Sequence, residues 1–140
     1  MLVCTPKLLA RLRNDQVDAL IEVMLLAAAA DGELSIEEVD QLQSCLLEVD
    51  ELWLTQIDLE RRLAEAHQRI SGADRATRLS SAKVILSDLD ARHAALELAI
   101  RVMASDGVMR TSERELILDT AEALDVDREN AADMVKAIVK

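Results

Sequence analysis

Residues that interrupt helices are scarce in this chain, and that scarcity is the strongest constraint on its fold. Glycine and proline together make up only four of the 140 residues. Pro6 stands where a first helical turn could begin. Two glycines directly follow an aspartate, in Asp31-Gly32 and Asp106-Gly107, and the third is Gly72. The long stretches between these breaks are rich in Ala and Leu, which are strong helix formers. We therefore predict an all-α fold.

Apolar residues recur at helical spacing along nearly the whole chain. Val17, Leu20, Ile21 and Met24 form one such stripe. Phe and Tyr are absent and Trp is present once, so the core is expected to consist of Leu, Ile, Val, Ala and Met. The pattern predicts a compact bundle of about seven to eight helices. A first short helix is expected to begin at residue 6. Further helices are expected over 15–30, 36–49, part of 54–70, 73–89, 90–104 and 111–124, and a last helix after residue 127.

The two halves of the sequence resemble each other. A shift of 75 positions places Asp31-Gly32 on Asp106-Gly107, and apolar positions coincide under the same shift. We interpret this as an internal duplication with the pattern Glu-x8-Asp-Gly-x5-Glu. It predicts one domain, residues 1–140, built from two related halves at about 15–70 and 73–140, each containing a helix-turn-helix. The duplicated acidic residues are Glu22, Asp31, Glu38, Glu97, Asp106 and Glu113.

These six carboxylates are candidate ligands of a divalent cation. Hard oxygen ligands favour Ca²⁺, Mg²⁺ or Mn²⁺. The turn sequence resembles the second half of a calcium EF-hand loop, but alanines or a valine occupy the first two ligand positions, so a working EF-hand is rejected. Asp31 and Asp106 also stand at expected helix C-termini, where the helix dipole disfavours a negative charge. A compensating partner is therefore expected for each of them.

A purely structural role is the alternative for the same residues. Glycine commonly ends a helix, and Glu38 could complete a capping box with Ser35. In the second half Arg110 replaces that serine, so capping does not account for Glu113 from the sequence alone. Both interpretations stay open at this stage.

Two further pairs share a helix face at a spacing of four residues. Asp18 and Glu22 form the first, and the shift of 75 places them on His93 and Glu97. If the two helices faced each other, the pairs could form a carboxylate-rich cation site with one imidazole. The alternative is that they lie on exposed faces of amphipathic helices, which is the more common situation for a histidine such as His93.

The charge of the chain is strongly acidic and unevenly distributed. The formal net charge is −11, which argues against a nucleic-acid partner. From residue 14 to residue 60 there are thirteen acidic residues and no Lys or Arg, whereas residues 61–83 hold six basic residues against two acidic ones. This segregation predicts an acidic and a basic face. A protein-interaction module that uses these faces is therefore the alternative to cation binding.

Several classes of protein are not favoured by the sequence. The chain has two histidines, no tyrosine, and no Gly-rich phosphate loop or catalytic triad order, so we expect no enzyme. The N-terminus lacks the apolar run of a signal peptide, and the longest apolar run has eight residues, too few to span a membrane. We expect a cytoplasmic protein with reduced cysteines, at most peripheral to a membrane.

The duplicated turn resembles the TerB family of tellurite-resistance proteins and related co-chaperone domains. The resemblance rests on residues 29–38, Ala-Ala-Asp-Gly-Glu-Leu-Ser-Ile-Glu-Glu, and on their repeat at residues 104–113. It implies a bundle of seven or eight helices, an acidic metal-chelating site formed by the six duplicated carboxylates, a link to bacterial stress responses, and partners that include membrane-associated proteins. Three residues of the second half depart from the pattern of the first half. Arg110 stands in place of Ser35, Thr111 in place of Ile36 and Arg101 in place of Leu26.

Overall fold

Helices account for all the regular structure in the described part of the chain, as the sequence predicted. The computed structural model describes residues 12–28, 36–47, 55–104 and 109–138. The helix predicted to begin at Pro6 lies outside these residues. The helices are α2 (Asn14–Ala28), α3 (Ile36–Leu47), α4 (Gln56–Ile70), α5 (Arg75–Ile85), α6 (Leu89–Met103), α7 (Thr111–Ala123) and α8 (Arg128–Ile138). None of them is long and apolar enough to cross a membrane.

Local hydrogen bonds fix where several helices begin. Thr55 Oγ1 accepts from the backbone N–H of Asp58 at 3.1 Å, and a carboxylate oxygen of Asp74 accepts from Thr77 N–H at 3.1 Å. Each side chain satisfies one of the backbone donors that a first helical turn leaves free. Between α4 and α5, Gly72 has a φ of +74°, a left-handed conformation that suits glycine.

One helix is shorter than the sequence predicted. The expected helix over 73–89 ends at Ile85, because Asp88 acts as the N-cap of α6 and accepts from Asp90 N–H at 3.1 Å. Leu86, between the two helices, is completely buried. The helix therefore ends four residues before the expected end.

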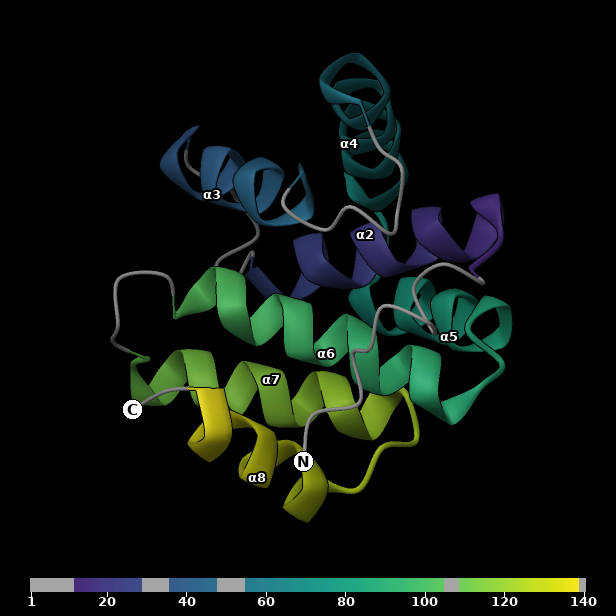
Figure 1. Cartoon of the computed structure of the whole chain (residues 1–140). Helices are drawn as coiled ribbons and strands as arrows, with labels where there is room; N and C mark the ends of the chain where they lie inside the picture. The colour runs from purple at the N-terminus through teal and green to yellow at the C-terminus, as the bar shows by residue number, and fades with distance from the viewer. Residues whose placement is uncertain (1–11, 29–35, 48–54, 105–108, 139–140) are drawn as a thin grey trace.

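The helix bounds follow the duplication. A shift of 75 residues takes α2 onto the bounds of α6 and takes α3 onto α7 with a difference of one residue at the C-terminus. The shifted α4 overlaps α8, while α5 has no counterpart in the described residues. Figure 1 shows α2 and α6 side by side in the middle of the molecule, with α3 and α4 on one side and α7 and α8 on the other.

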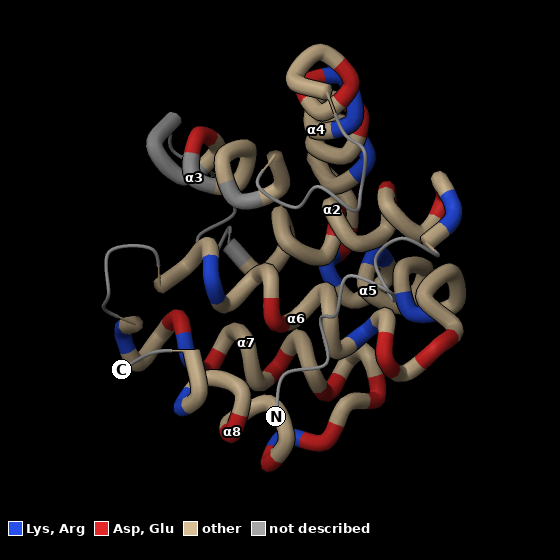
Figure 2. The backbone as a smooth tube through the Cα atoms, in the orientation of Figure 1, with Lys and Arg blue, Asp and Glu red and all other residues tan. Residues whose placement is uncertain are grey.

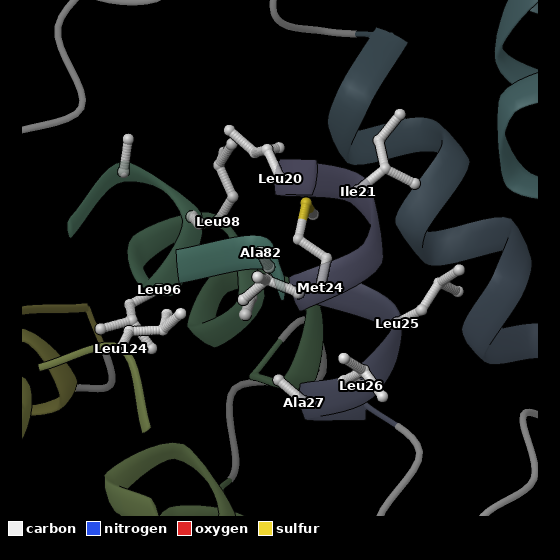
Figure 3. Close-up of a cluster of buried hydrophobic side chains, with 14 of the residues drawn as sticks. Leu20, Ile21, Met24, Leu25, Leu26, Ala27, Ala82, Leu96, Leu98 and Leu124 are labelled. Atoms are coloured by element: carbon white, nitrogen blue, oxygen red, sulfur yellow. The ribbon is translucent and has the colours of Figure 1, made fainter. Parts of the chain in front are cut away.

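The core is aliphatic and centres on α2 and α6. Leu20, Ile21 and Met24 of α2 are fully buried, as are Leu96 and Leu98 of α6 (Figure 3). Burying a side chain of this size contributes roughly 1.5–3 kcal/mol. Such burial leaves these two helices no solvent-exposed face over most of their length, so any polar side chain in their middle is buried too.

Arg92 ties the ends of two helices to α6. Its guanidinium donates to three backbone carbonyls, those of Leu86 at 2.6 Å, Lys83 at 3.0 Å and Leu124 at 3.2 Å. These carbonyls lie at the C-termini of α5 and α7, where backbone acceptors lack helical partners and a positive charge is favoured. No sequence pattern predicted that Arg92 would bind these carbonyls.

We expect Arg92→Met to lower the free energy of unfolding by about 3 kcal/mol, because it leaves three partly buried carbonyls without a donor. Urea denaturation followed by circular dichroism measures the change. Arg114→Met is the matched control, since Arg114 is exposed on α7, and it should change stability by less than about 0.5 kcal/mol. Equal effects of the two substitutions would contradict this role.

Candidate functional site

Three of the six predicted acidic residues have described side chains. These are Glu22 on α2, Glu97 on α6 and Glu113 on α7. Asp31 and Asp106 lie outside the described residues, as does the side chain of Glu38, whose backbone belongs to α3. The geometry of the site is therefore built from the first three and from the residues around them.

Glu22 is buried and is held by two arginines. Its side chain is 5% exposed. Arg69 Nε of α4 donates to one carboxylate oxygen at 3.3 Å, and Arg78 Nε of α5 donates to the other at 2.5 Å. The hydrogen bond to Glu22 raises the pKa of Arg78. Two guanidinium groups thus compensate the burial of one carboxylate.

One turn earlier on α2, Asp18 is paired in the same way. Arg62 of α4 donates through Nη1 to Asp18 at 2.5 Å and through Nε to Asp58 at 3.0 Å. Arg62 itself is only 9% exposed. Hydrogen bonds from Arg61 and then from Arg62 hold the pKa of Asp58 below its ordinary value. The acidic stripe of α2 therefore faces the arginines of α4 and α5.

The basic stretch of the sequence acts as a set of internal partners. Each of its six cations contacts an acceptor in the structure. Figure 2 shows the blue segments of α4 and α5. The pairs are Arg61 with Asp58 and Glu65, Arg62 with Asp18 and Asp58, Arg69 and Arg78 with Glu22, Arg75 with Thr120 and the Leu26 carbonyl, and Lys83 with Asp125. Charges that are segregated along the sequence are thus paired in the folded chain, although Arg61, Arg69 and Lys83 remain partly exposed.

Glu97 occupies the same position on α6 that Glu22 occupies on α2, but its surroundings differ. Its side chain is 0% exposed, and neither carboxylate oxygen accepts a hydrogen bond from any residue that the structure describes. Arg101, one turn further on and 44% exposed, brings Nη2 to 3.3 Å from Oε2 without hydrogen-bonding geometry. Burying an ionised carboxylate with so few compensating contacts is costly.

His93 lies one turn before Glu97 on the same helix face. The residue is partly buried, and its Nε2 atom is buried with no hydrogen-bond partner in the described part of the chain. The expectation of two exposed helix faces is therefore wrong for both Glu22 and Glu97. The idea of one site shared by the two pairs is wrong as well, because Asp18 and Glu22 point toward α4 and α5.

Glu113 caps its own helix. One carboxylate oxygen accepts from the backbone N–H of Arg110 at 2.9 Å. This is the half of a capping box that requires no Ser or Thr at the N-cap. Capping therefore accounts for Glu113, contrary to the expectation from the sequence, because the backbone N–H of Arg110 supplies the donor whatever side chain stands at the N-cap.

The described residues differ in how well they fit a bound cation. Glu22 does not fit, because both its oxygens already bind guanidinium groups. Glu97 and His93 fit, because their buried oxygen and nitrogen atoms lack partners. In the residues described, no three His, Cys, Asp or Glu side chains gather in one place, so these two would form part of a ligand set.

The fold and the site define a small helical domain in which two equivalent helices each carry a buried glutamate. The family model of the tellurite resistance protein TerB matches residues 17–136, almost the entire chain. The chain belongs to the TerB family. Neither the curated proteins nor the solved structures contain a significant match to it.

Replacing Glu22 should destabilise the fold. Glu22→Gln removes the charge that compensates Arg69 and Arg78, and breaking a buried ion pair costs about 3 kcal/mol. Chemical denaturation measures the loss. Glu129→Gln, at an exposed position of α8, is the matched control and should change stability by less than about 0.5 kcal/mol. A loss no larger than that of the control would contradict the pairing.

The paired Asp58 should make the stability of the fold sensitive to acid. Its pKa is lowered in the folded state, so it stabilises the fold above its ordinary pKa, and this contribution is lost as the pH falls below about 4. In Asp58→Asn the free energy of unfolding should therefore fall less steeply between pH 5 and pH 3. Urea titrations at several pH values measure this, and an unchanged slope would show that Asp58 carries none of the effect.

Proposed function

We propose that this TerB domain binds a divalent cation in its second half, with the Glu97 carboxylate as the central ligand. One observation carries the proposal. Glu97 is completely buried, and its oxygens receive no hydrogen bond from the described residues. Burial of an ionised carboxylate is costly unless positive charge compensates it, and a bound metal ion supplies that charge.

The first half supports this interpretation by contrast. At the equivalent position, Glu22 receives two guanidinium groups from α4 and α5. Among the described residues, the cation paired with Glu97 is Arg101, which is partly exposed. In the residues described, Glu22 thus accepts two hydrogen bonds from guanidinium groups, whereas Glu97 accepts none.

The remaining ligands are proposed from the sequence. Asp31, Glu38 and Asp106 keep their role as candidate oxygen ligands, whereas we assign Glu22 to the ion pairs of the core and Glu113 to helix capping. Carboxylate ligands suit Ca²⁺, Mg²⁺ or Mn²⁺. Substitution of Asp31 or Asp106 by Asn distinguishes ligands from turn residues without changing side-chain size.

We place this binding in a bacterial stress response, such as resistance to tellurite. Membership of the family whose model describes a tellurite resistance protein supports that context. We further propose that the domain acts in the cytoplasm by binding and not by catalysis, since the sequence offers few acid–base groups. Docking of a protein partner through charged faces is the weaker proposal, because the six cations of residues 61–83 contact acceptors within the molecule.

Isothermal titration calorimetry with Ca²⁺, Mg²⁺ and Mn²⁺ tests cation binding. We expect heat of binding for at least one ion and a rise in melting temperature, because a ligand that binds only the folded state stabilises it. Glu97→Gln should abolish both effects, whereas Glu129→Gln, at an exposed site on α8, should retain them. Absence of binding by the unmodified protein, or equal binding by Glu97→Gln, would contradict the proposal.

A further inference from the structure

We propose that His93 and Glu97 together bind one first-row transition-metal ion, through imidazole Nε2 and a carboxylate oxygen. This inference rests on the proposed function and adds a nitrogen ligand and a class of metal to it. It also makes the two halves of the domain unequal. The first half holds its buried acid with arginines, and the second half holds it with a metal ion.

The helix fixes the spacing of the two ligands. His93 and Glu97 are four residues apart in α6, which runs without interruption from Leu89 to Met103. Side chains at this spacing lie on one face, with their Cβ atoms roughly 5–6 Å apart. Two metal ligands at positions i and i+4 of a helix can therefore bind the same ion, as in zinc sites of the H-E-x-x-H type.

The histidine supplies evidence that is independent of the acid. Its Nε2 atom is buried and has no hydrogen-bond partner among the residues described. Leaving a buried polar atom without a partner costs roughly 1–3 kcal/mol, so a structural histidine would ordinarily gain a partner. Coordination of a metal ion by Nε2 removes that cost. Glu97, one turn away, has the same deficit at both oxygens.

Arg101 explains how Glu97 is accommodated when no metal ion is bound. Its guanidinium lies 3.3 Å from the carboxylate, yet donates no hydrogen bond to it, and the side chain is 44% exposed. Such a side chain can turn toward solvent with little loss. In the first half the same position is Leu26, which is buried and uncharged. We therefore infer that an incoming metal ion displaces Arg101 from Glu97.

The donor set determines the class of metal. Imidazole nitrogen binds Zn²⁺, Ni²⁺ or Fe²⁺ well, whereas Mg²⁺ and Ca²⁺ prefer sites made of oxygen alone. A site that combines His93 with carboxylates should therefore prefer Zn²⁺ to Mg²⁺. At the equivalent position of α2 the histidine is replaced by Asp18, which is paired with Arg62. Only the second half has the nitrogen ligand.

The imidazole resonances of the protein test the site directly, because the chain contains only two histidines. His67, exposed on α4, serves as an internal control. In long-range ¹H–¹⁵N spectra of the full chain, Zn²⁺ should shift the Nε2 resonance of His93 and leave that of His67 unchanged. An equal concentration of Mg²⁺ should shift neither. A wild-type spectrum in which Zn²⁺ leaves His93 unchanged would overturn the inference.

Matched variants complete the test. His93→Gln should weaken Zn²⁺ binding about tenfold or more, since loss of even an outer partner of a metal ligand costs 10–100-fold. His67→Gln should bind as the unmodified protein does. If cation binding depends on Glu97 but is unaffected by His93→Gln, the nitrogen ligand is wrong and the proposed function stands. If Glu97→Gln binds normally, both fail.

Discussion

Each of the two central helices buries a carboxylate near its middle, Glu22 in α2 and Glu97 in α6. The apolar faces of α2 and α6 pack together to form the core, and this packing also buries Glu22 and Glu97. Removing such a charge from water costs several kcal/mol unless a cation lies beside it. In the first half, α4 and α5 supply arginines to Glu22. Their positions against α2 are thus set by charge as well as by apolar packing.

The two halves differ in the contacts that compensate the charge of the buried glutamate. The helices repeat at an interval of 75 residues, but the cations around the two acids do not. Glu22 has two hydrogen-bonded guanidinium groups, whereas Glu97 has one ion pair without a hydrogen bond in the described structure. A duplicated fold retains its core because both copies need it, and one copy can then change its polar contacts. Of the two buried glutamates, Glu97 on α6 is therefore the one whose charge a bound cation would compensate.

Guanidinium groups also hold the bundle together away from the acids. Arg92 binds carbonyls at the ends of α5 and α7, and Arg75 binds the Leu26 carbonyl near the end of α2 together with Thr120 of α7. These contacts join segments that meet only in the folded state. Although the formal net charge is −11, Arg75 and Arg92 therefore bind acceptors within the molecule. The chain belongs to the TerB family, and the proposed cation site rests on its helical fold.

The helices, their approximate limits and the repeat could be predicted from the sequence, because helical periodicity and caps act within a few neighbouring residues. The complete burial of the middle of α2 and α6 could not, because it depends on how the helices pack. The sequence also singled out Glu22 and Glu97. Which acids are paired with arginines depends on tertiary packing. Arg62, Arg69 and Arg78 lie 44 to 56 positions from the acids that they contact. Such pairs depend on how whole helices pack, and a run of charges along the chain cannot distinguish an exposed face from a set of internal partners.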